Sequence, residues 1–187
     1  MTTAGVILAG GHASRVGGVD KAMFRIDNVP LLTRAITALS SCSEIIVVGP
    51  TRDVASAPST WIVEDPPVSG PVAALAAALA HTSADDIIVL PADLADAEEA
   101  VRHLTGHNDG TDGVVLVDPS GRAQWLTARY RRSALRQALA ATPHSGDRAP
   151  SLRRVVSLLT LTERPAPWRA TRDVDTWEDL QELGGTT

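Results

Sequence analysis

Short apolar runs rich in β-branched residues alternate along this chain with segments of helical periodicity. The apolar runs predict strands at residues 4–9, 45–48, 61–63, 87–90 and 114–117. Helical patterns predict helices after Pro30, at 73–80 behind Pro71, at 95–104 and at 133–141. Because the strand runs are apolar on both sides, they are typical of a mostly parallel sheet covered by helices on both faces. We therefore expect an α/β fold that binds its ligand beyond the carboxyl ends of the strands.

The second half of the chain is less regular but shows no domain boundary. Residues 121–130 mix polar and apolar side chains and predict a strand at the edge of the sheet. Ser151, Asp175 and Thr176 are N-cap residue types and predict two final helices. No internal repeat and no long linker occur, so we expect a single domain over residues 1–187.

Composition excludes several classes of protein. The formal net charge is −5 and no run of five like charges occurs, so a broad basic face for nucleic acid is not expected. Cys42 is the only cysteine, which excludes an internal disulfide and a cysteine-rich zinc site. The apolar run at 6–9 is too short for a signal peptide or a membrane span. We therefore expect a cytoplasmic protein that binds neither nucleic acid nor a membrane.

A glycine-rich segment follows the first predicted strand directly. It places four glycines within residues 10–18, which lets the backbone approach a ligand and use its amides to bind an anion. Arg15 and Lys21 add two cations suited to a triphosphate. The two common phosphate-loop motifs are absent. A loop of about a dozen residues after a buried strand is more often functional than an incidental surface loop.

The pattern L-A-G-G-x-x-x-R-x-G-G-x-D-K over residues 8–21 resembles the signature of the molybdenum cofactor guanylyltransferases, which are nucleotidyltransferases like molybdopterin-guanine dinucleotide biosynthesis protein A. The resemblance implies a three-layer Rossmann-like fold of the GT-A nucleotidyltransferase type with a mostly parallel, mixed sheet. It implies that Arg15 and Lys21 hold the phosphates and act in catalysis. It also implies nucleotide contacts by the residues that open the motif, Leu8, Ala9, Gly10 and Gly11.

The segment from Glu64-Asp65 to Gly70-Pro71 resembles the E-D-x(n)-G-P-L-A-G stretch of the same family. There, the matching aspartate takes part in nucleotide binding, so we expect Asp65 and Gly70 to bind the nucleotide. A carboxylate suits guanine, because the N1–H and the exocyclic amine of guanine are both donors. The alternative is that Asp65 is a turn residue that caps its own loop.

Asp93 follows the predicted strand at 87–90, where a carboxylate can hold a hard cation against phosphates. The family carries C-D-x-P here, and Asp93 matches its metal-binding aspartate, which implies a catalytic residue that binds Mg²⁺. Ala92 replaces the cysteine and Leu94-Ala95 replaces x-Pro, so the acceptor side of the pocket is in question. Capping of the next helix is the alternative for Asp93 and the expected role of Asp96.

The resemblance divides the chain into a nucleotide-binding half, 1–105, and an acceptor-binding half, 106–187. Residues 124–130 resemble Q-P-L-x-A-x-Y with Trp125 in place of proline, and residues 146–154 resemble the G-x-x-S-L-R stretch. In the family this half faces the pterin. Three arginines are therefore candidates for contacts with a phosphate or pterin carbonyls: Arg148, Arg153 and Arg154. A solvated basic helix start is the alternative, which we prefer for Arg154.

Residues 172–180 resemble N-x-N-T-P-E-D-L, with Trp177 in place of proline. Asp173 or Asp175 is a candidate for a second metal contact. The alternative is that Asp175 or Thr176 caps the last helix, which we prefer for Thr176. The D-x-D form also occurs in relatives that use CTP and in guanylyltransferases that act on phospholactate.

We expect an enzyme that transfers GMP from GTP to the phosphate of a molybdopterin-type molybdenum cofactor and releases pyrophosphate, with Mg²⁺ as its cofactor. Its partners would be GTP and a phosphate-bearing pterin, and the involvement of cofactor-delivery proteins stays open. One alternative is the same transfer with CTP and molybdopterin, or with GTP and phospholactate. Another is a paralogue that binds a nucleotide without turnover. The joint presence of Arg15, Lys21 and Asp93 argues against that paralogue.

Overall fold

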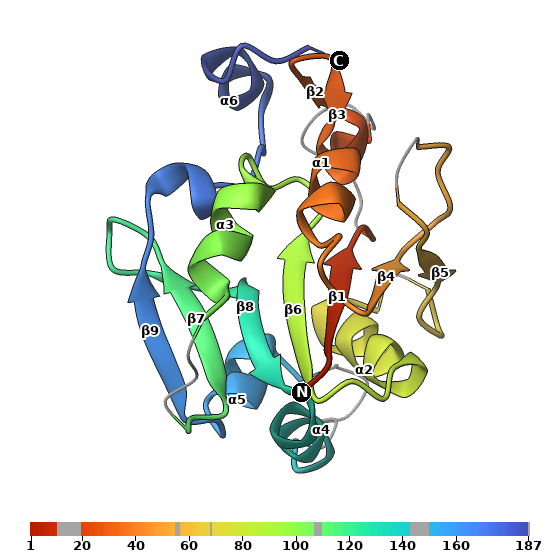
Figure 1. Ribbon diagram of the computed structural model, residues 1–187, viewed down its shortest axis with the longest axis vertical. Helices are drawn as coiled ribbons and strands as arrows, with labels where there is room; N and C mark the ends of the chain where they lie inside the picture. Colours follow the sequence, from red (N-terminus) through yellow and green to blue (C-terminus); the bar gives the residue numbers. More distant parts are fainter. Residues whose placement is uncertain (11–19, 55–56, 68, 107–109, 143–149, 187) are drawn as a thin grey trace.

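The computed structural model describes residues 1–187 except 11–19, 55–56, 68, 107–109, 143–149 and 187. Its centre is a seven-stranded sheet in the order β5-β4-β1-β6-β8-β7-β9 (Figure 1). The strands are β1 (Thr3–Leu8), β4 (Glu44–Val48), β5 (Thr60–Ile62), β6 (Asp86–Pro91), β7 (Gly113–Val117), β8 (Ala123–Arg131) and β9 (Leu161–Pro165). β8 pairs antiparallel with β6 and β7, and the other pairs in this sheet are parallel. The expected mostly parallel, mixed sheet is confirmed.

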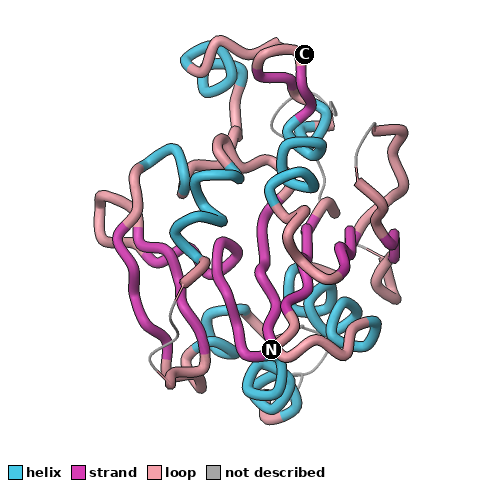
Figure 2. Tube along the Cα trace, in the orientation of Figure 1, coloured by secondary structure: helices cyan, strands magenta, loops and turns pink. Residues whose placement is uncertain are grey.

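Helices cover both faces of the sheet, which confirms the expected three layers (Figure 2). One face packs against α1 and α3, and the other packs against α2, α4 and α5. Alternate strand residues point to opposite faces, as Val6 and Ile7 of β1 do. These helices are α1 (Leu31–Ala38), α2 (Pro71–His81), α3 (Ala97–Leu104), α4 (Arg132–Ala140) and α5 (Leu152–Val156). None of the helices among the described residues is long and apolar enough to cross a membrane.

Local signals explain where several helices begin. Pro71 occupies the first turn of α2 after Gly70, whose φ of 91° favours glycine. Asp96 caps α3 by accepting a hydrogen bond from the backbone N–H of Glu99 at 3.0 Å. Ser151 stands at the N-cap position of α5, but its side chain makes no capping hydrogen bond. The expected cap at Asp96 is confirmed.

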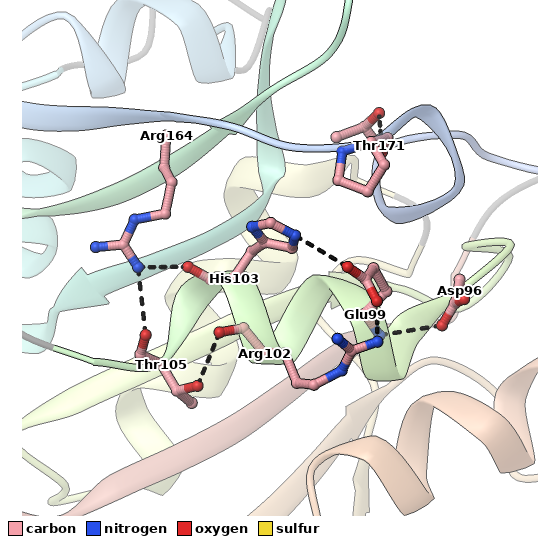
Figure 3. A network of polar contacts seen from close by, with 8 residues as sticks. Asp96, Glu99, Arg102, His103, Thr105, Arg164 and Thr171 are labelled. Atoms are coloured by element: carbon pink, nitrogen blue, oxygen red, sulfur yellow. Dashed lines mark hydrogen bonds and ion pairs between the residues drawn. The ribbon is translucent and has the colours of Figure 1, made fainter.

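The prediction of an edge strand at 121–130 is wrong in one respect. The strand exists as β8, but it lies inside the sheet between β6 and β7. The edge position belongs to β9, whose sequence Leu-Thr-Glu-Arg-Pro carries little apolar signal. Arg164 of β9 donates hydrogen bonds to the carbonyls of His103 (2.5 Å) and Thr105 (3.2 Å) at the end of α3 (Figure 3). A polar side chain therefore helps to hold β9 in place.

A small third core lies beyond the carboxyl ends of β1 and β6, at the top of Figure 1. It joins a hairpin of β2 (Arg25–Ile26) and β3 (Val29–Pro30) to the last helix, α6 (Trp177–Glu182). The ring of Phe24 lies 4.9 Å from that of Trp177, between centroids. Arg25 and Thr186 exchange two backbone hydrogen bonds of 2.7 Å. The end of the chain is thereby fixed next to the segment that begins at Lys21.

Candidate active site

The ends of the parallel strands form the floor of the site. The backbone N–H of Ala9 donates to Val48 at 2.8 Å, and that of Ala92 donates to Leu8 at 3.1 Å. The residue after Ala9 is Gly10, which is exposed at this edge. Leu8, Ala9 and Gly10 therefore lie at the carboxyl edge of the sheet, as predicted. Gly11 and Arg15 lie outside the described residues.

Arg52 contacts residues on both sides of the glycine-rich segment, Ala9 before it and Asp20 after it. Its guanidinium donates to both carboxylate oxygens of Asp20 and, at 3.0 Å, to the carbonyl of Ala9. It also donates to the carbonyl of Pro50 at 3.1 Å. Its side chain is only 12% exposed. Sequence reasoning missed this residue, because an arginine four positions after a strand matches no motif and its partners are 32 and 43 residues away.

Lys21 opens the short 3-10 helix η2 (Lys21–Met23), which Asp20 caps by accepting from the N–H of Ala22. The Lys21 ammonium donates to Asp175 Oδ1 at 2.6 Å. The Lys21 side chain is 16% exposed, whereas that of Asp175 is 49% exposed. Asp175 therefore fixes the position of the Lys21 ammonium.

Asp93 lies two residues beyond β6 and meets the segment before α6. The backbone N–H of Val174 donates to the carbonyl of Asp93 at 2.8 Å, and Leu94 forms an isolated antiparallel bridge with Asp173. Two carboxylates that are 80 positions apart in sequence are thus brought together. The cap of α3 is Asp96, so capping does not account for Asp93.

Burial controls the charge of this carboxylate pair. Burial raises the pKa of Asp93, while the Lys21 ammonium acts against the rise and Asp175 adds to it. Burial likewise raises the pKa of Asp173 to about 7, and the charges of Asp93 and Asp175 add to that rise. A cation between the two carboxylates would relieve this repulsion.

The donor set fits a hard cation that is shared with phosphates. Among the described residues, no three His, Cys, Asp or Glu side chains are placed to hold a metal ion on their own. Mg²⁺ usually takes only one or two carboxylates and completes its shell with phosphate oxygens and water. Asp93 and Asp173 supply two such carboxylates at the carboxyl edge of the sheet.

Asp65 and Gly70 lie in the segment between β5 and α2. Asp65 is exposed, while its neighbour Glu64 is 6% exposed. Glu64 Oε1 lies 3.8 Å from the position that a Cβ on Gly10 would occupy. Gly70 stands at the N-cap of α2, as its place before Pro71 predicts.

The acceptor half is only partly brought to this edge. Tyr130 is buried, and its hydroxyl donates to the carbonyl of Trp125 at 2.6 Å, so these two residues support the sheet. Gln124 donates to Asp118 at 2.9 Å near the start of β8. Arg122, which sequence reasoning missed, lies close enough to Asp173 to lower its pKa.

Of the arginines proposed for the acceptor, the two that the structure describes have no contact with Asp93. Arg153 and Arg154 are exposed on α5, which lies beside α4 and away from the upper edge in Figure 1. The helix α5 packs on the face of the sheet that α2 and α4 cover, and pterin contacts by Arg153 stay a prediction. The solvated reading of Arg154 holds. Arg148 lies outside the described residues.

Thr176 caps α6, as expected. Its side chain accepts from the N–H of Asp179 at 3.1 Å, and Asp179 accepts from the N–H of Thr176 at 2.9 Å. Asp179 also pairs with Arg172. This capping leaves Asp175 free to bind Lys21.

Comparison with known proteins points to one family. The model of the MobA-like NTP transferase domain matches residues 5–163. A molybdenum cofactor guanylyltransferase of Serratia proteamaculans is 33% identical over 96 residues, which span about half of each protein (49% and 49%). A probable molybdenum cofactor guanylyltransferase of Natronomonas pharaonis is 29% identical over 95% of this chain and 94% of that protein.

Solved structures share the fold over nearly the whole chain. Molybdopterin-guanine dinucleotide biosynthesis protein A from Archaeoglobus fulgidus superposes with a TM-score of 0.68 and 18% identity, covering 96% of each chain. 2-C-methyl-D-erythritol 4-phosphate cytidylyltransferase from Thermus thermophilus superposes with a TM-score of 0.72 and 16% identity, covering 98% of this chain and 97% of the other. At these identities the likeness shows a common fold and does not decide the nucleotide.

Proposed function

Since the chain belongs to the family of MobA-like NTP transferase domains, we propose that it transfers GMP from GTP to the phosphate of a molybdopterin-type molybdenum cofactor. A phosphate oxygen of the acceptor attacks the α-phosphorus of GTP in line. The new P–O bond forms as the bond between the α-phosphorus and the bridging oxygen breaks, and pyrophosphate leaves. The acceptor phosphate is ionised at neutral pH, so no protein base is needed.

The observation that carries the proposal is the proximity of Lys21, Asp93 and Asp173 at the carboxyl edge of the sheet. Phosphoryl and nucleotidyl transfers depend mainly on positioning and on neutralising charge. Lys21, held by Asp175, supplies a fixed cation for the phosphates. The two carboxylates would hold Mg²⁺, which supplies neutralisation of phosphate charge when it is bound.

The names of the relatives support the choice of GTP and a pterin acceptor. Arg15 and the loop amides are proposed to hold the phosphates together with Lys21. A cytoplasmic location is part of the proposal, and delivery of the acceptor by a partner protein is compatible with it.

Pyrophosphate release from GTP, CTP, ATP and UTP, each with and without molybdopterin, tests the proposal. We expect release only with GTP and acceptor together, and only with Mg²⁺ present. Lys21→Ala is the matched negative control. Faster release with CTP would move the assignment to cytidylyl transfer, and GTP binding without release under any condition would favour the non-catalytic paralogue.

A further inference from the structure

A second cavity, with a volume of about 480 Å³, lies beside α1. The helices α1 and α3 are neighbours on one face of the sheet (Figure 1). The cavity is lined by Val29 of β3, by Arg34, Thr37 and Ala38 of α1, by Ser40 after α1, and by Glu98 of α3. Ligand pockets in proteins have volumes of roughly 300–1,000 Å³. The cavity is therefore large enough for a small molecule, and none of the described residues proposed for the active site lines it.

Arg34 presents a guanidinium that lacks a partner in the described part of the chain. Its Nε atom is buried and has no hydrogen-bond partner there. None of the ion pairs between described residues includes Arg34. Buried donors nearly always have partners, because a buried polar group without one costs free energy. A carboxylate matches the planar guanidinium with two parallel hydrogen bonds.

Glu98 supplies the opposite charge from the neighbouring helix. It is exposed, and it likewise takes part in none of the ion pairs between described residues. Arg34 and Glu98 thus line one cavity without pairing with each other. A simple anion on Arg34 would be repelled by Glu98, and a simple cation on Glu98 would be repelled by Arg34. A ligand with both charges would satisfy both residues.

The remaining walls suit a short aliphatic ligand. Val29 and Ala38 offer apolar contacts to methylene groups. The Thr37 hydroxyl donates to the carbonyl of Thr33 at 2.8 Å, so only its lone pairs are left for a ligand. An ammonium group offers three donors to such acceptors.

We propose that this cavity binds a small zwitterion, with the carboxylate of the ligand on Arg34 and its ammonium group on Glu98. The two groups would be joined by a short chain of methylenes, as in an amino acid. The inference is independent of the proposed function, since it uses no residue of the active site. A ligand that bridges α1 and α3 would stabilise the folded protein by mass action.

Calorimetry and thermal melts with glycine, β-alanine, γ-aminobutyrate and ε-aminocaproate test the proposal, because this series increases the distance between the two charges. We expect one member to bind with a dissociation constant on the order of 1 mM, the range for a ligand of so few atoms. It should also raise the melting temperature. Acetate and ethylamine, which carry one charge each, should bind at least about tenfold more weakly. Saturating GTP should leave the binding unchanged.

Variants locate the site. Arg34→Met and Glu98→Gln should each weaken binding by about tenfold or more, the loss of one charge-assisted contact. Pyrophosphate release should stay near wild type in both variants. Arg102→Met, which removes an exposed arginine of α3 that pairs with Glu99, and Glu178→Gln on exposed α6 sequence are the matched controls and should bind as wild type does. Glu98 is exposed, so Glu98→Gln tests the site even if Arg34→Met does not fold.

Three results would overturn the proposal while the proposed function stands. The first is that no member of the series binds saturably at concentrations up to roughly 50-fold above the expected dissociation constant. The second is binding that Glu98→Gln leaves unchanged. The third is equal binding of acetate, which would mean a site for a simple anion. Competition by GTP would place the binding in the active site and would likewise overturn the proposal.

Discussion

Replacing Arg52 should loosen the glycine-rich segment at both of its ends. In Arg52→Met the chain loses the bonds to both carboxylate oxygens of Asp20 and to the carbonyls of Ala9 and Pro50. Lys21 directly follows Asp20, so the position proposed for it beside the phosphates would depend on this contact. Methionine keeps most of the apolar part of the arginine side chain and removes the hydrogen-bond donors of its guanidinium.

The structure sets the size of the effect. Hydrogen bonds to charged groups contribute about 1.5–3 kcal/mol to the free energy of unfolding. The Asp20 side chain is 42% exposed, so we place the contribution of the contact between Arg52 and Asp20 near the lower end of this range. We expect the free energy of unfolding to fall by about 2 kcal/mol, or roughly 4–8 °C in melting temperature for a chain of this size. Turnover should fall by about 10- to 100-fold, because small misplacements of phosphate-binding groups are costly.

Thermal melts and steady-state pyrophosphate release measure both effects. Asp20→Asn and the double variant complete a double-mutant cycle, and the pair should show a coupling of about 1 kcal/mol or more. Arg136→Met, on the exposed side of α4, is the matched control and should behave as wild type. Wild-type turnover in Arg52→Met, or additive effects in the cycle, would refute the view that Arg52 holds the loop.

Three further predictions concern the charged groups of the site. Lys21→Ala should lower turnover by roughly 10- to 100-fold, the loss of one charge-assisted phosphate contact, with a melting temperature close to wild type; unchanged pyrophosphate release would contradict this. Asp93→Asn should abolish Mg²⁺-dependent release while GTP still binds without metal, and near-normal release at saturating Mg²⁺ would remove Asp93 from the site. In metal-free buffer Asp173→Asn should raise the melting temperature, more at pH 8 than at pH 5. The reason is that burial raises the pKa of Asp173 to about 7, so its contribution to stability declines as the pH rises from about 4 towards 7 and is lost above it. Equal shifts at the two pH values would contradict this reasoning.

Much of the fold could be predicted from local patterns. The apolar runs located β1, β4, β6 and β7 to within a residue or two, because a strand buried on both faces must be apolar throughout. Pro71 and Asp96 marked helix starts, since capping and proline geometry act between close neighbours in sequence. The composition of the glycine-rich segment predicts a phosphate-binding loop, and residues 11–19 of that segment lie outside the described residues.

Contacts between distant segments decided the rest. The strand β9 was not predicted, because its edge position is secured by pairing with β7 and by Arg164, and not by its own apolar content. The pairing of Asp175 with Lys21 joins residues 154 positions apart. The packing of α5 beside α4, which leaves Arg153 exposed, likewise depends on contacts between distant segments.

The sequence by itself determined which chemical groups this protein carries and which strands and helices present them. Only the tertiary structure decided which groups meet. Strand order brings Glu64 close to Gly10 and Arg52 into contact with Asp20. The return of the chain end over β2 brings Asp173 close to Asp93. Burial and electrostatic interactions depend on distance in space, whereas a sequence pattern reflects only the interactions between residues that are close in the chain.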